Sequence, residues 1–248
     1  MIIELFGPPG AGKTTFALAL DRRMRESGHR TALRLSQRPT ERISFGARAG
    51  PYHNVTMQRL TRPLLETLSI AHRPRDNSRH LKTAVHLVGL LPPRGFFSSV
   101  KEFQYVIRLS HSWHQNSGFA ELAIFDQGFV QAVCSLALLA GGASDTILAN
   151  ALNYAPKSDL LIRLNAPFEI LEARLKNRHR RQTAMEQKFE LKIEMSLASG
   201  TIIDRLHRVL LEQGRPVLGA SSLDQRSLNE SVRLIENEVT KRLKLVER

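Results

Sequence analysis

The chain has 248 residues, of which 42% are hydrophobic and 24% charged, an ordinary composition for a globular protein. Its most apolar run, residues 130–140, is interrupted by polar residues and is too short to span a bilayer, which argues against a membrane protein. A single cysteine, Cys134, cannot form an internal disulfide, and Met1 leads directly into the first predicted strand. We therefore expect a cytoplasmic protein without a signal or transit peptide.

The formal net charge of +13 is unevenly distributed along the chain. Between residues 21 and 110 there are 17 Lys and Arg against 6 Asp and Glu, so this segment carries most of the excess. Such a basic segment suits either an anionic small molecule or nucleic acid. A solvated surface that serves only solubility is the alternative interpretation.

The first recognisable motif is Gly-Pro-Pro-Gly-Ala-Gly-Lys-Thr at residues 7–14, which fits the pattern G-x-x-x-x-G-K-[ST]. Residues 2–6 before it are apolar and predict a buried strand, and residues 15–27 after it have helical spacing. This strand, loop and helix order is the context that a phosphate-binding loop requires. The residues expected to hold a nucleotide are Gly7, Pro8, Pro9, Gly10, Ala11, Gly12, Lys13, Thr14 and Thr15.

The residue types of this loop match the chemistry of phosphate binding. Glycines let the backbone curl so that successive N–H groups and the helix N-terminus point at negative charge. Lys13 supplies a positive charge for the β- and γ-phosphates, and the hydroxyl of Thr14 is placed to ligate Mg²⁺.

A second strand is predicted over residues 30–36, where the side chains alternate. It leads into Arg38 and Arg42 at the edge where open α/β sheets bind ligands, so these arginines are candidate contacts for an anionic substrate. A plain polar loop is an equally good interpretation of each arginine alone. Glu41 is the acid that lies nearest to this strand end.

The segment from Ser44 to Gly118 is too long to be a simple connection and must contain structure of its own. Apolar spacing predicts helices over residues 56–72, 81–91 and 98–114, with a basic loop at residues 73–79. His111 and His114 continue the apolar stripe of the last helix, where a hydrogen-bonded core role is the more common one. We interpret residues 37–118 as a helical, substrate-binding insertion.

An apolar strand is predicted to end at Asp126. A carboxylate at this point is a candidate to hold Mg²⁺ or to accept a proton during phosphoryl transfer. A cap for the following helix, predicted over residues 130–140, is the structural alternative, and the two roles are compatible.

Another helix is predicted over residues 145–154 and a fourth strand over residues 160–164, followed by a helix that begins near Pro167. Its end contains four arginines, Arg174, Arg178, Arg180 and Arg181. They could neutralise the charge of a phosphoryl group in transfer, with Arg174 and Arg178 as the catalytic candidates. Favourable charge at a helix C-terminus is the alternative.

The rest of the chain predicts a helical stretch over residues 183–213, divided at Gly200, then a fifth strand over residues 217–220 and a final helix. No internal repeat, low-complexity tract or linker divides the chain, so we expect one domain over residues 1–248.

The chain resembles the P-loop nucleoside and nucleotide kinases, and thymidylate kinase-like proteins in particular. The matching parts are residues 7–14, the strand ending in Asp126, and the strand and arginine-bearing helix of residues 160–181. Residues 217–223 and the final helix also fit the pattern. The resemblance implies a three-layer α/β fold with a five-stranded parallel sheet in the order 2-3-1-4-5. It also implies a lid at residues 174–183 and a position near adenine for residues 219–222.

The chain also departs from that family's pattern. Thymidylate kinases usually have Arg after the strand-ending Asp, whereas Gln127 and Gly128 follow Asp126 here. Arg38-Pro39 only faintly resembles the family's Arg-Glu-Pro-Gly loop. These departures concern the acceptor substrate rather than the phosphoryl donor.

Together these features predict an ATP- and Mg²⁺-dependent kinase of a small-molecule acceptor: a nucleoside, a nucleotide or a similar metabolite. The basic segment favours an anionic acceptor, and a homodimer is left open. The guanine motif Asn-Lys-x-Asp and the D-x-x-G switch spacing are both absent, which argues against a switch GTPase. Two alternatives stay open: a polynucleotide kinase-like enzyme, against which the low aromatic content of 6% argues, and a non-catalytic regulator that binds nucleotide.

Overall fold

The computed structural model describes residues 1–36, 74–116, 122–181 and 193–246. Arg38, Glu41, Arg42 and the helix predicted over residues 56–72 lie outside the described residues, as do the last two residues of the predicted lid.

The centre of the described structure is a five-stranded parallel sheet in the order β2-β3-β1-β4-β5. The strands are β1 (Ile2–Phe6), β2 (Thr31–Arg34), β3 (Leu122–Phe125), β4 (Leu160–Asn165) and β5 (Val217–Ser221). β1 lies in the middle, with Ile3 opposite Ile124 of β3 and Leu160 of β4. This confirms the predicted strand order, and all five residues of β1 are buried, as expected for a parallel strand covered on both faces.

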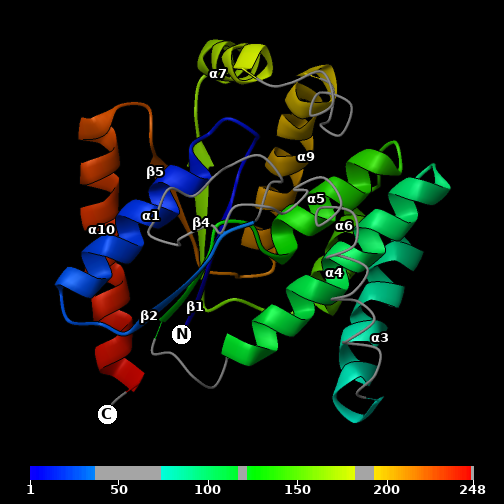
Figure 1. Ribbon diagram of the computed structural model, residues 1–248, viewed down its shortest axis with the longest axis horizontal. Helices are drawn as coiled ribbons and strands as arrows, with labels where there is room; N and C mark the ends of the chain where they lie inside the picture. The colour runs from blue at the N-terminus through cyan, green and yellow to red at the C-terminus, as the bar shows by residue number, and fades with distance from the viewer. Residues whose placement is uncertain (37–73, 117–121, 182–192, 247–248) are drawn as a thin grey trace, which may run out of the picture.

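Helices cover both faces of the sheet, giving three layers (Figure 1). One face carries α1 (Lys13–Glu26) and α10 (Gln225–Val246). The other carries α3 (Pro74–Leu90), α4 (Phe96–Asn116), α5 (Phe129–Leu139), α6 (Asp145–Tyr154) and α9 (Ile193–Glu212). The remaining described helix, α7 (Phe168–Arg181), follows the carboxyl end of β4 (Figure 1).

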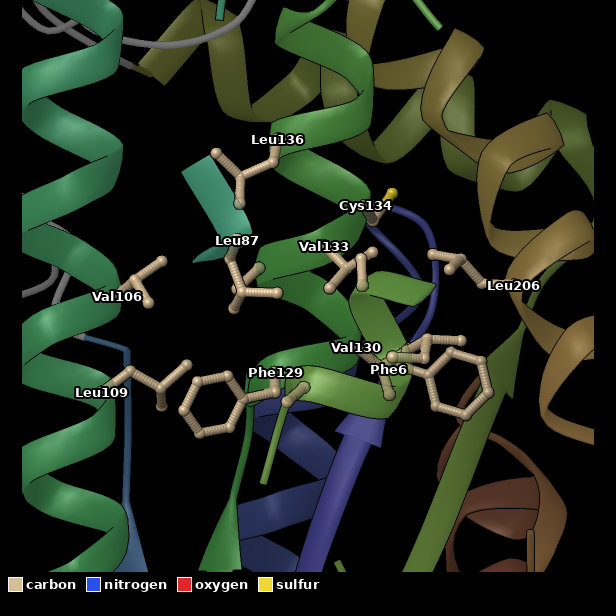
Figure 2. Close-up of a cluster of buried hydrophobic side chains, with 14 of the residues drawn as sticks. Phe6, Leu87, Val106, Leu109, Phe129, Val130, Val133, Cys134, Leu136 and Leu206 are labelled. Atoms are coloured by element: carbon tan, nitrogen blue, oxygen red, sulfur yellow. The ribbon is translucent and has the colours of Figure 1, made fainter. Parts of the chain in front are cut away.

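Two apolar cores, one on each side of the sheet, hold these layers together. Ile3 and Leu5 of β1 point toward α1 and α10, whereas Ile2 and Phe6 point toward α5 and α9. Figure 2 shows the second core, where Phe6 meets α5 and Leu206 of α9. Burying one such side chain contributes about 1.5–3 kcal/mol, so the alternation along β1 fixes the helices on both faces.

Two predicted boundaries are wrong. The segment 74–79, predicted as a loop, is the first part of α3, which begins at Pro74, a residue that suits the first helical turn. The helix predicted to divide at Gly200 instead runs through it as α9. A glycine inside a helix costs only about 1 kcal/mol relative to alanine, which the buried stripe containing Ile203 and Leu206 outweighs.

Among the described residues, no helix combines the length and the apolar character needed to cross a lipid bilayer.

Candidate functional site

The predicted phosphate-binding loop, residues 7–14, lies at the carboxyl end of the central strand β1 and leads directly into α1. Gly12 is the N-cap of α1 and has φ 90°, a left-handed conformation that favours glycine. A Cβ on Gly12 would also lie 2.7 Å from the Oγ of Ser222, in the loop after β5. The first turn of α1 contains no acid and Gly12 makes no side-chain cap, so the helix N-terminus suits an anion.

The side chain of Lys13, the first residue of α1, folds back into the phosphate-binding loop. Its side chain is buried, and its Nζ donates hydrogen bonds to the carbonyl oxygens of Gly7 at 2.7 Å and Pro8 at 3.1 Å. Thr14 follows at the start of α1, and Thr15 is exposed beside it. The ammonium group is therefore held at the loop, within reach of a phosphate that binds there.

Asp126 lies under the start of α1, at the end of the neighbouring strand β3. It is completely buried, and its Oδ2 accepts a hydrogen bond from the Oγ1 of Thr14 at 2.9 Å. Ser36, just after β2, donates to both carboxylate oxygens: its N–H to Oδ1 at 2.6 Å and its hydroxyl to Oδ2 at 3.2 Å. The adjacent strands β1, β3 and β2 thus bring together Lys13, Thr14, Asp126 and Ser36.

The pair Thr14 and Asp126 fits Mg²⁺ in its chemistry. Hydroxyl and carboxylate oxygens are hard ligands, and Mg²⁺ is usually held by one or two protein oxygens together with water and substrate phosphates. Within the described ranges, no group of three or more His, Cys, Asp or Glu could hold a metal ion by itself. A site completed by nucleotide phosphates is the arrangement that this donor set suits.

Ser36 was not among the sequence candidates. It is the last residue of the strand predicted over residues 30–36, at the edge of the sheet that binds ligands, but its residue type alone does not distinguish it from other serines. Only the strand order, which places β2 next to β3, identifies it as the partner of Asp126.

The structure connects Arg174 of α7 to the backbone of two loops. Its Nη1 donates to the carbonyl oxygen of Gly10 at 3.0 Å. Its Nη2 donates to the carbonyl oxygens of Ser222 at 2.9 Å and Leu223 at 2.8 Å. Arg178 lies one turn further along α7 and is partly exposed, and Arg180 is exposed. The contacts of Arg174 hold the phosphate-binding loop against the loop after β5.

Replacing Arg174 with lysine is expected to lower the free energy of unfolding by about 1–3 kcal/mol, because one ammonium group cannot reach three carbonyl oxygens in two loops. Chemical denaturation measures this loss. The matched control is Arg226→Lys, which alters an exposed i,i+4 pair with Glu230 on α10. Equal stability of Arg174→Lys and the wild type would show that these contacts do not support the loops.

A cleft of about 590 Å³ opens beside the loop, between α7, α9 and the carboxyl ends of β4 and β5. Its lining combines apolar side chains with a few polar ones. The lining residues are Pro8, Arg163, Asn165, Ala166, Pro167, Phe168, Leu171, Gly200, Asp204, Ser221 and Leu223. Arg163 is paired with Asp204 in this lining.

No protein-family model and no curated protein sequence matches the chain. A solved structure of deoxyadenosine kinase from M. mycoides, with dCMP and dCDP bound, has a similar fold: 13% identity over 97% of this chain and 100% of that chain, with a TM-score of 0.51. The same enzyme with dATP bound is 14% identical over 97% of this chain and 99% of that chain, with a TM-score of 0.48.

Because the sequence identity is only 13%, the TM-score of 0.51 shows a shared fold alone. The fold is a three-layer P-loop fold, and its parallel sheet has the strand order that the family resemblance implied. The solved structures described above are of a deoxyadenosine kinase, so the narrower resemblance to thymidylate kinases stays a prediction.

Proposed function

We propose that this protein is an ATP- and Mg²⁺-dependent phosphotransferase whose acceptor is a small molecule, with nucleosides and nucleotides as the first class to consider. The observation that carries the proposal is the contact of Thr14 with the buried Asp126 at 2.9 Å, beside the loop that holds Lys13. A glycine-rich turn with a structural role alone needs neither a buried cation nor a carboxylate against the first helical turn.

In this proposal each residue has a separate task. Lys13 exchanges its contacts with the Gly7 and Pro8 carbonyl oxygens for oxygens of the β- and γ-phosphates. Thr14 and Asp126 would hold Mg²⁺, which when bound would neutralise charge on the phosphate oxygens. Ser36 orients the Asp126 carboxylate through two hydrogen bonds. Arg174 and Arg178 of α7, with Arg180 beside them, are candidates to contact the phosphoryl group in transfer.

From the sequence, Arg174 was predicted to be a catalytic residue, and this catalytic role stays a prediction. Its three backbone contacts suit a residue that sets the distance between the phosphate-binding loop and the loop after β5. The cleft lined by Ser221 and Leu223 is where we place the base of the donor nucleotide.

The acceptor would bind between α4 and Asp126. Within the described part of the chain, the hydroxyl of Tyr105 and the Nε of Arg108 are buried without a hydrogen-bond partner. Burial raises the pKa of Tyr105, and the nearby carboxyls of Glu102, Asp126 and Glu4 raise it further. Buried polar groups without partners are costly, and a polar acceptor would supply partners for both. The solved structure of similar fold is a deoxyadenosine kinase, which makes deoxynucleosides the first acceptors to test.

The test is ADP release from Mg·ATP with a panel of acceptors: nucleosides, nucleoside monophosphates, sugars and 5′-hydroxyl oligonucleotides. We expect turnover with a nucleoside or nucleotide, and Asp126→Asn should lower it about 10²-fold because the charge that would hold Mg²⁺ is removed. The control is Asp159→Asn, at the opposite end of the sheet, where the carboxylate accepts a hydrogen bond from the N–H of Ile2. Tight Mg·ATP binding without turnover of any acceptor would contradict a kinase and favour a regulator.

A further inference from the structure

β1 carries a carboxyl group in the middle of the sheet. Glu4 is 1% exposed, between Ile3 and Leu5, which are completely buried. Because side chains alternate along a strand, Glu4 lies on the same face as Ile2 and Phe6, toward α5. A buried carboxyl group is costly unless it is hydrogen-bonded, so its partner indicates why it is there.

The partner of Glu4 is the N-terminus of α5. The Oε1 of Glu4 accepts a hydrogen bond from the N–H of Val130, in the first turn of that helix. The N-cap residue of α5 is Gly128, which makes no side-chain cap of its own. A Cβ on Gly128 would lie 2.5 Å from the Cδ of Glu4. Glu4 thus takes the place of an N-cap side chain, and only glycine at position 128 leaves room for it.

A second hydrogen bond connects α5 to the loop after β1, and here the side chain belongs to α5. The N–H of Gly7, the first residue of the phosphate-binding loop, donates to the Oε1 of Gln131 at 3.4 Å, and this contact is buried. β1 therefore contributes a side chain to the backbone of α5, and α5 contributes a side chain to the backbone of the loop after β1. We call these two hydrogen bonds the Glu4–Gln131 clasp.

The clasp joins the two chain segments that carry the proposed metal ligands. Asp126 lies four residues before Val130 on one segment, and Thr14 lies seven residues after Gly7 on the other. We propose that Glu4 and Gln131 are positioning residues, which pin the turn at residues 126–131 to the phosphate-binding loop and so set the place of Asp126 relative to Thr14. The consequence for nucleotide binding rests on the proposed function, whereas the pinning of the loop does not.

The first measurement is amide hydrogen exchange of Gly7 and Val130 by NMR in the protein without nucleotide. In Gln131→Met and Glu4→Met, which keep the side-chain length but remove the acceptor oxygen, we expect exchange of the amide that lost its partner to rise about tenfold or more. Glu4→Gln keeps an acceptor oxygen and should exchange like the wild type. The matched control is Glu236→Gln, which changes another buried carboxyl that bonds Arg23 and Ser27 on the other face.

The second measurement is the affinity for Mg·ADP by calorimetry. Both methionine variants should bind about tenfold more weakly, while Glu4→Gln and Glu236→Gln bind like the wild type. Each methionine variant leaves one backbone N–H without its acceptor, so we expect it to lose stability and to unfold at a lower temperature than the wild type. Thermal unfolding measures this loss, and the affinities are compared at a temperature at which every variant is fully folded.

Unchanged exchange of Gly7 and Val130 in both methionine variants would overturn the proposal. If Glu4→Met does not fold, Gln131→Met decides alone, because it leaves Glu4 in place. A wild-type protein that binds no Mg·ADP would contradict the proposed function, and the exchange result would still decide the clasp.

Discussion

Replacing Lys13 with alanine is expected to lower acceptor-dependent phosphoryl transfer by about 10²–10³-fold, the cost of removing one charged donor from a transferring phosphoryl group. The structure gives the physical reason. The Lys13 ammonium lies inside the phosphate-binding loop and donates to the Gly7 and Pro8 carbonyl oxygens, which places its charge where the phosphates would bind. Steady-state ADP release with the best acceptor of the panel measures the loss.

The control for Lys13→Ala is Lys157→Ala, which removes the same charge from an exposed position before β4, at the opposite end of the sheet. Its turnover should equal that of the wild type. Lys13→Ala should also retain the wild-type fold by circular dichroism, because the helix N-terminus needs no side chain from residue 13. Wild-type turnover in Lys13→Ala would refute the assignment of the loop as the donor site.

Replacing Glu4 with glutamine is expected to stabilise the protein in a pH-dependent way. Burial raises the pKa of Glu4 to about 8, although the N–H of Val130, the charge of Arg215 and the N–H of Gln131 act in the opposite direction. The folded state therefore keeps a proton on Glu4 that the unfolded chain releases above its ordinary pKa. As pH rises from about 4.5 to about 8 the wild type loses stability, and above the folded pKa the loss levels off.

Glutamine resembles the protonated acid and has no charge to desolvate. The difference in unfolding free energy between Glu4→Gln and the wild type should thus grow by about 3–5 kcal/mol between pH 4 and pH 9. Urea denaturation at several pH values measures it. A difference that does not change with pH would show that Glu4 ionises normally in the folded protein.

Glu236→Gln is a control whose stability, relative to the wild type, should change with pH in the opposite direction to that of Glu4→Gln. Burial disfavours ionisation of Glu236, but hydrogen bonds from Ser27 and Arg23 outweigh burial and lower its pKa. Its ionised form therefore stabilises the folded protein above its ordinary pKa, and this stabilisation is lost as pH falls. Relative to the wild type, Glu236→Gln should become less stable as pH rises, whereas Glu4→Gln becomes more stable.

The parts of the fold that the sequence predicted are those where neighbours in the chain are neighbours in space. Residues 2–26 form strand, loop and helix in immediate succession, so the pattern around Lys13 contains the whole unit. Asp126 was found because an apolar strand ends there, and the ends of parallel strands share one edge. The predicted strand order followed from the resemblance and is confirmed.

The parts that the sequence did not predict depend on contacts between distant segments. Glu4 and Val130 are 126 residues apart, and a lone Glu in an apolar strand does not specify its partner. Arg174 is one of four similar arginines, and no spacing reveals that its guanidinium contacts backbone oxygens of two loops. Gly200 was expected to break a helix because local propensity omits the packing on either side of it.

The central place of β1 in the sheet determines when the sheet can form during synthesis. β1 leaves the ribosome first, but its neighbours β3 and β4 begin at residues 122 and 160. At about 5–20 residues per second, the strand waits on the order of 10 s for its first partner. Through that interval Ile2, Ile3, Leu5 and Phe6 have no sheet to join. The nascent chain therefore exposes an unpaired apolar strand, which is a starting point for aggregation until β3 has been made.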